Sequence, residues 1–183
     1  MIIALAGRRI DAPDAKAIRF PLINVDKVKK DLRKFFISAR PIALVCSGAC
    51  GADLLALQVA GDLRIQRRMV LPFEAAIFRS TSVTDRPGNW GILFDTIYET
   101  LNKERGIIIL NYSVDDKDAF EKTNTEILNQ AEDLVEKFNL TKDVTVVIVW
   151  EGNPKEKNDT TNHFMQEGIK RDFTVKEIKT LNH

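Results

Sequence analysis

The stretch ALVCSGACGADLLAL, residues 43–57, changes character in its middle. An apolar run, Ile42–Cys46, ends at a short segment of serine, glycine and cysteine, and apolar residues then return at helical spacing. A buried strand, a glycine-containing turn and a helix are together the building unit of a parallel α/β sheet. The stretch therefore predicts strand, turn and helix in that order. The open question is whether the turn, Ser47–Gly51, also binds a ligand.

Apolar runs alternate with amphipathic patterns along the rest of the chain. Several runs are continuously apolar, which is typical of parallel strands covered by helices on both faces. We therefore expect an α/β fold, a doubly wound, mostly parallel, Rossmann-like sheet in three layers, as one domain over residues 1–183. The predicted strands are 2–7, 42–46, 69–73, 106–111, 145–150 and, at an edge, 173–181. The first predicted helix begins at Asn24, an expected N-cap. Four further helices are predicted over 51–63, 90–101, 120–138 and 161–171. Loops are expected at 8–23, at 74–89, which includes one short helix, and at 151–160.

Composition narrows the class of protein. Of the 183 residues, 27 are basic and 26 acidic, giving a net charge of +1, so general nucleic-acid binding is disfavoured. No apolar run approaches the roughly 20 residues that span a bilayer. The N-terminus, MIIALAGRR, lacks the basic start of a secretory signal, and the chain has only two cysteines. We expect a cytoplasmic protein that does not enter the membrane.

Ligands in such sheets bind outside the carboxyl ends of the strands, so the loops that follow the strands are the candidate site. Glycines and hydroxyls gather in these loops, which suits the binding of an anion by backbone N–H groups at helix N-termini. After the first strand, Arg8 and Arg9 are either two solvated surface arginines or include one that clamps a phosphate through paired donors. The candidate ligand-binding residues in these loops are Gly7, Arg8, Arg9, Ser47, Gly48, Gly51, Ala52, Pro72, Thr160 and Thr161.

Four further side chains raise separate questions. Asn124 interrupts the apolar stripe of its helix, so it either satisfies backbone groups or faces a ligand. Trp90 either stacks on a base or belongs to the core. Asp53, in the first turn of its helix, either stabilises that helix or holds a ribose hydroxyl or a loop amide. Asp53 and, more weakly, Glu151 are the candidate catalytic acids.

The cysteines indicate no metal site. Cys46 and Cys50 are four residues apart, and the only histidines available as further ligands are His163 and His183. A metal site commonly needs three or four such ligands. We expect both cysteines to be small buried hydrophobic residues, and we expect neither a metal nor a cofactor.

The order of these motifs resembles the SLOG superfamily, which groups the DNA-processing protein DprA, the Lonely Guy phosphoribohydrolases and the TRPM-type ligand-sensing domains. The resemblance rests on Gly7-x-Arg9, Ser47-Gly48-x-x-Gly51-Ala52-Asp53, Leu71-Pro72-Phe73, Trp150-Glu151-Gly152 and Asp159-Thr160-Thr161. It implies a Rossmann-like domain in which Gly48, Gly51 and Thr161 hold the phosphate of a nucleotide-type ligand, flanked by Arg9. Members often form dimers, so the resemblance is compatible with a homo-oligomer, and the sequence leaves the oligomeric state open.

Three functions follow from these expectations. The first is a sensor or carrier that binds a nucleotide or nucleotide-derived small molecule. The second is an enzyme, a nucleotide N-glycosidic hydrolase of the phosphoribohydrolase type. The Lonely Guy pattern P-G-G-x-G-T-x-x-E is here EKNDTTNHF, without the glycine pair or the acid, which argues against this second function. The third is a DNA-binding module like DprA, which the near-neutral charge disfavours.

Overall fold

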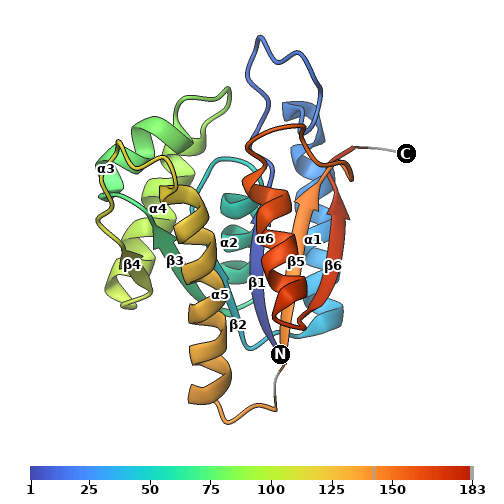
Figure 1. Cartoon of the computed structure of the whole chain (residues 1–183), viewed down its shortest axis with the longest axis vertical. Helices are drawn as coiled ribbons and strands as arrows, with labels where there is room; N and C mark the ends of the chain where they lie inside the picture. The colour runs from blue at the N-terminus through green and yellow to red at the C-terminus, as the bar shows by residue number, and fades with distance from the viewer. Residues whose placement is uncertain (142, 182–183) are drawn as a thin grey trace.

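A computed structural model of the chain describes residues 1–141 and 143–181 (Figure 1). Those residues form one six-stranded sheet with helices on both of its faces. The strands are β1 (Ile2–Gly7), β2 (Ala43–Cys46), β3 (Gln66–Leu71), β4 (Ile107–Ile109), β5 (Val144–Trp150) and β6 (Thr174–Lys179). The helices are α1 (Val25–Ala39), α2 (Ala52–Asp62), α3 (Ala75–Phe78), α4 (Trp90–Lys103), α5 (Ala119–Lys137) and α6 (Thr160–Lys170), with a 3-10 turn η1 (Leu22–Asn24) and a π-helical turn η2 (Arg79–Val83).

All six strands of this sheet are parallel, in the order β4-β3-β2-β1-β5-β6. The chain steps outward from β1 to β4, and α5 then carries it back to β5 on the other side of β1. The predicted doubly wound, Rossmann-like α/β fold is confirmed, including β6 as an edge strand. The change of direction between β1 and β5 is the topological switch point, where open α/β sheets bind their ligands.

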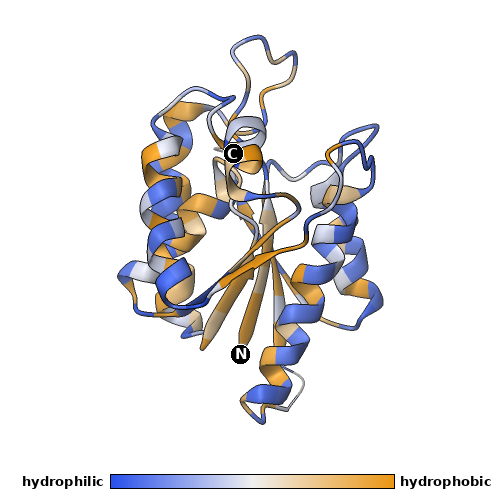
Figure 2. Ribbon diagram, turned by 90° about the vertical axis from the view of Figure 1, so that its left-hand side faces the viewer, coloured by the Kyte–Doolittle hydropathy of each residue, from blue (hydrophilic) through white to orange (hydrophobic). Residues whose placement is uncertain are grey.

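Two hydrophobic layers hold the sheet between its helices. Helices α1, α2 and α4 bury their apolar residues against one face, and α5 and α6 bury theirs against the other. Figure 2 shows the apolar strands in the middle and the polar helix faces turned outward. In α1, Val28, Leu32 and Phe36 are buried at four-residue intervals, which is the spacing of one helix face. The three layers agree with the expectation from sequence.

Two local expectations need correction. Strand β3 begins at Gln66, three residues before the predicted start, because pairing with β2 continues through the polar residues Arg67 and Arg68. Asn24 occupies the N-cap position of α1, but its side chain makes no capping bond. The Asn24 amide donates instead to the carbonyl of Thr180, 2.8 Å away, and so ties α1 to the end of β6.

The end of β1 and the start of α2 approach each other at Gly7. A Cβ on Gly7 would lie 2.4 Å from the Cβ of Ala52 and 2.7 Å from the carbonyl oxygen of Val149. We expect Gly7→Ala to lower the free energy of unfolding by about 1–3 kcal/mol, because backbone would have to move to relieve the overlap. Urea unfolding measures this. Gly61→Ala is the matched control, since the three atoms nearest to its Cβ would belong to the guanidinium at the far end of the Arg67 side chain rather than to backbone. An equal loss in both variants would contradict the prediction.

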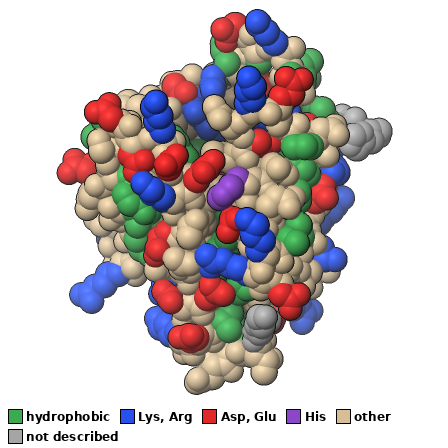
Figure 3. Space-filling view, in the orientation of Figure 1, with side chains coloured by type: hydrophobic (Ala, Val, Ile, Leu, Met, Phe, Trp, Pro, Cys, Tyr) green, Lys and Arg blue, Asp and Glu red, His purple; other side chains and the backbone are tan. Residues whose placement is uncertain are grey.

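The surface shows no simple charge pattern on the face in Figure 3, where Lys and Arg side chains are intermixed with Asp and Glu. Across residues 1–141 and 143–181, no helix combines the length and apolar character that a membrane crossing requires. Neither observation by itself identifies a partner.

Candidate functional site

A cavity of about 460 Å³ opens at the carboxyl ends of β1 and β2, beside the first residues of α6. This volume falls within the range of about 300–1,000 Å³ that is usual for small-molecule pockets. The cavity lies at the switch point of the sheet, on the edge that the sequence predicts for ligand binding.

The structure brings together only part of the predicted site. The predicted residues that line the cavity are Gly7, Arg8, Arg9, Ser47, Asp53, Asn124, Thr160 and Thr161. The predicted residues that lie outside its lining are Gly48, Gly51, Ala52, Pro72, Trp90 and Glu151. The hydroxyl of Ser47 has no hydrogen-bond partner among the described residues, so it is available to a ligand.

The glycines of the opening loop serve packing. Gly51 has φ +99°, and a Cβ on it would lie 2.8 Å from the carbonyl oxygen of Arg8. A Cβ on Gly48 would lie 3.0 Å from the Met69 sulfur and 3.3 Å from the Phe94 ring. Glycine is therefore needed at position 51 by both conformation and space. These positions show that the loop packs closely on Arg8 at the end of β1 and on Met69 and Phe94 of the core.

Pro72 and Trp90 lie in the interior. The carbonyl of Pro72 accepts the backbone N–H of Tyr112 at 2.9 Å. Trp90 is 5% exposed and donates its indole N–H to the Pro87 carbonyl at 2.9 Å. Of the two alternatives for Trp90, the structure places it in the core beside Phe94 and Ile97.

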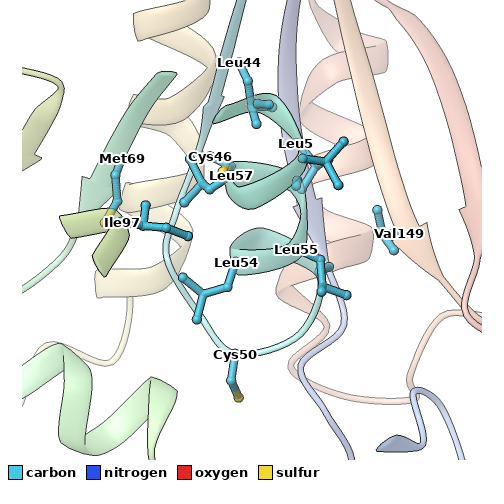
Figure 4. Close-up of a cluster of buried hydrophobic side chains, with 14 of the residues drawn as sticks. Leu5, Leu44, Cys46, Cys50, Leu54, Leu55, Leu57, Met69, Ile97 and Val149 are labelled. Atoms are coloured by element: carbon cyan, nitrogen blue, oxygen red, sulfur yellow. The ribbon is translucent and has the colours of Figure 1, made fainter. Parts of the chain in front are cut away.

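Both cysteines are buried free thiols, as expected, and burial raises the pKa of each (Figure 4). Cys46 packs near Leu57, and Cys50 lies in the loop before α2. His163 faces Glu167 on its own helix, and His183 lies outside the described residues. In the described part of the chain, no group of three or more His, Cys, Asp or Glu side chains could hold a metal ion.

Arg8 is the centre of a buried charge cluster. Its guanidinium donates to Glu151 through Nε at 2.7 Å and to Asp159 through Nη1 at 2.5 Å, and it also donates to the Asn153 carbonyl at 2.9 Å. Its Cζ lies 5.6 Å from the centre of the Trp150 ring. With its donors occupied by two carboxylates and a carbonyl, Arg8 joins the ends of β1 and β5 to the start of α6.

The carboxylates of this cluster are held ionised. Burial alone would raise the pKa of Glu151, but hydrogen bonds from Arg8, from its own backbone N–H and from Arg19 outweigh it and lower the pKa. Burial also opposes ionisation of Asp159, and the bonds from Arg8 and from two backbone N–H groups reverse the effect. A general acid needs a pKa near the working pH. A lowered pKa and a place outside the cavity lining disfavour Glu151 as a general acid, and its carboxylate is bound to Arg8.

Asp53 lies in a different environment. Its side chain is buried at the wall of the cavity and accepts the Ala49 backbone N–H at 3.3 Å through one carboxyl oxygen. Burial raises its pKa from 3.8 to about 7, while that N–H and the nearby Arg9 only partly oppose the shift. Asp53 thus holds a loop amide, one of the roles considered for it, and its other oxygen has no partner among the described residues.

The start of α6 presents unpaired donors to the cavity. Asp159 caps the helix by accepting the Asn162 N–H at 3.1 Å, which leaves the backbone N–H groups of Thr160 and Thr161 without partners in the described structure. Thr161 is 5% exposed, and its hydroxyl is likewise unpaired within residues 1–141 and 143–181. Asn124 donates to the Thr160 carbonyl at 2.8 Å and so orients this turn from α5. It both satisfies a backbone group and lines the cavity.

Three cationic side chains of the lining were missed from sequence: Arg19, Arg86 and Lys155. Arg19 lies in the loop after β1, where it pairs with Glu151, and Arg86 lies in the loop before α4. Lys155 follows β5, on the loop that leads to α6. The three come from loops without periodicity, so no spacing rule places them. The only feature of the sequence that could have indicated these three residues is that they lie in loops that follow predicted strands.

Comparison with known proteins assigns no family. No family model matches the chain, and a search of curated proteins gives no significant match. Among solved structures, UDP-GlcNAc 2-epimerase from Methanocaldococcus jannaschii, in complex with UDP-GlcNAc and UDP, is 12% identical with a TM-score of 0.35 over 87% of this chain and 55% of that one. A putative transcriptional regulator from Clostridium difficile 630 is 17% identical with a TM-score of 0.24 over 85% and 52%. The chain spans about half the length of each, and at these TM-scores neither similarity indicates a function.

Proposed function

We propose that this chain binds a nucleotide or nucleotide-derived small molecule at the switch-point cavity and acts as a sensor or carrier. The observation that carries the proposal is the start of α6, where Thr160 and Thr161 line a cavity of ligand size, and where their backbone N–H groups and the hydroxyl of the buried Thr161 have no partner among the described residues. Such donors at a helix N-terminus favour a phosphate.

The charge cluster supports a phosphate at this position. Asp159 at the cap would repel an anion, but Arg8 neutralises it through two hydrogen bonds. Lys155 adds a cation to the same part of the lining. The ribose would lie toward Ser47 and the free oxygen of Asp53, which are hydrogen-bonding groups on the same wall.

The resemblance to the SLOG superfamily is part of this proposal. The cavity at the carboxyl edge and the role given to Thr161 agree with it. At Gly48 and Gly51, an added Cβ would meet protein atoms, which gives both glycines a packing role beside the phosphate role that the resemblance implies. We therefore propose that phosphate contacts come from the α6 side of the cavity.

Thr161→Val tests the phosphate position. We expect it to weaken binding of nucleoside monophosphates about tenfold or more, because a hydrogen bond to a charged group contributes about 1.5–3 kcal/mol. Thermal-shift screening with nucleoside monophosphates and ADP-ribose-type ligands, followed by calorimetry, measures this. Thr96→Val, on the exposed face of α4, is the control. If no ligand shifts the folded wild-type protein, the proposed function is wrong.

One observation favours a second function, the hydrolysis of an N-glycosidic bond. Asp53 combines a place in the cavity wall with a pKa of about 7, which suits proton transfer at neutral pH. Water would add to the anomeric carbon as the base departs with a proton. Release of free base from nucleoside monophosphates, abolished in Asp53→Asn, would support this function, and binding without turnover would exclude it.

A further inference from the structure

Arg9 and Arg86 form a second cationic site on the cavity wall. Both residues line the cavity, and both contact one carboxylate, that of Asp85. Arg9 donates to Asp85 through Nη2, and the Nε of Arg86 lies 3.8 Å from the other Asp85 oxygen. One carboxylate thus serves two guanidinium groups, which leaves the trio with a net charge of +1.

Each of the two guanidinium groups also has one nitrogen without an acceptor, although Arg9 contacts the Cys50 thiol as well as Asp85. The Nε atoms of Arg9 and Arg86 are buried and have no hydrogen-bond partner among the described residues. Buried polar atoms are nearly always paired, so each exception calls for an explanation. Two such exceptions on adjacent guanidinium groups show that the protein satisfies this pair only in part, and both side chains line the cavity. A phosphoryl group is an acceptor that arginine binds well, because its oxygens match the fork of donors.

This cationic site lies across the cavity from the start of α6. Arg9 follows β1 and pairs with Gly51 on the β2 side, and Arg86 precedes α4, which covers β3 and β4. Thr161 and Lys155 follow β5, on the other side of β1 in the sheet. The cavity therefore has anion-binding groups on both sides of the β1 end.

We propose that the ligand carries two separated anionic groups, as a nucleoside 3′,5′-bisphosphate does, with one phosphoryl group at the start of α6 and the other on Arg9 and Arg86. This inference rests on the proposed function and adds the ligand class to it. Ser47 and Asp53 line the cavity as well, where their oxygens can bond ribose hydroxyls. A single phosphate would leave the Arg9 and Arg86 side unused.

Calorimetry with the 5′-monophosphates and 3′,5′-bisphosphates of adenosine, guanosine, cytidine and uridine tests the inference at constant ionic strength. For at least one base, we expect the bisphosphate to bind wild type at least tenfold more tightly than the monophosphate. Arg86→Gln should remove this gain, so that the monophosphate and the bisphosphate of the same base bind the variant with similar affinity. Asp85→Asn should increase the gain, because it removes the competing carboxylate. Arg33→Gln, at an exposed pair with Asp62, is the charge control.

The outcomes separate this inference from the proposed function. Monophosphate binding without a bisphosphate gain, or a gain that persists in Arg86→Gln, overturns the inference alone. Absence of binding by every nucleotide overturns both. If Arg86→Gln does not fold, as judged by circular dichroism, Asp85→Asn decides the question, since an unchanged bisphosphate affinity in that variant also overturns the inference.

Discussion

Arg8→Met is expected to lower the free energy of unfolding at pH 7 by about 3–5 kcal/mol, because removing one partner of a buried ion pair leaves an uncompensated charge. Arg8 is 3% exposed, and Glu151 and Asp159 each accept two hydrogen bonds from it. Methionine matches the length of the arginine stem without its charge. Arg19 still pairs with Glu151 in the variant, whereas Asp159 loses the cation that neutralises it.

The loss of stability in Arg8→Met should be larger at pH 7 than at pH 5. In the wild type, the lowered pKa values of Glu151 and Asp159 give stability that is complete above their ordinary values of 4.5 and 3.8 and is lost as pH falls through the lowered ones. Without Arg8, fewer hydrogen bonds oppose the effect of burial, so both pKa values lie higher than in the wild type and the carboxyl groups become neutral at a higher pH. The difference in the free energy of unfolding between wild type and Arg8→Met should therefore become smaller as the pH is lowered from 7 to 5.

Urea unfolding of both proteins at pH 7, 6 and 5 measures this gap. The matched control is Arg33→Met, because Arg33 pairs with Asp62 at the surface, where both side chains are 48% exposed. Surface pairs contribute about 0–1 kcal/mol, so the control should lose little stability at any pH. The prediction would be contradicted if Arg8→Met lost as little stability as the control, or if its loss of stability were the same at all three pH values. Either result would show that the charge cluster does not stabilise the fold at the site.

The cluster also shows why the site was harder to predict than the fold. The apolar runs that form β1, β2 and β5 are local signals, and their pairing follows from the connection rules of α/β sheets. Arg8 and Glu151, in contrast, are 143 residues apart in the sequence. Both were selected from sequence because they follow strands, and no spacing rule indicates that they bind each other.

The glycines of the stretch 43–57 also show that a sequence pattern can leave the function of a residue undecided. Glycine next to a strand end is compatible with a ligand and with close backbone packing, and the sequence pattern is identical in both cases. At Gly51 the backbone of Arg8 provides the reason. Thr161 and Asn124 were easier to place, since the N-terminal turns of helices after parallel strands lie at the ligand edge.

Asp53→Asn is expected to stabilise the folded protein, increasingly so as pH rises from 5 to 8. The buried carboxyl group has its pKa raised from 3.8 to about 7, so the native state binds an extra proton between these values. Wild-type stability must therefore fall as pH rises through that range, by about 4 kcal/mol in total, and level off above pH 7. Asparagine can accept the Ala49 N–H in the same way and carries no charge to bury.

Thermal unfolding of wild type and Asp53→Asn at pH 5, 6, 7 and 8 measures the effect, with roughly 2–4 °C expected per kcal/mol for a chain of this size. Asp62→Asn is the matched control, because it lies at the exposed end of the same helix. The carboxylates around Arg8 titrate below this window and do not obscure it. A stability difference that stays constant with pH would contradict the raised pKa. A gain in stability accompanied by weaker nucleotide binding would mean that the buried carboxyl group of Asp53 serves the ligand at the expense of the fold.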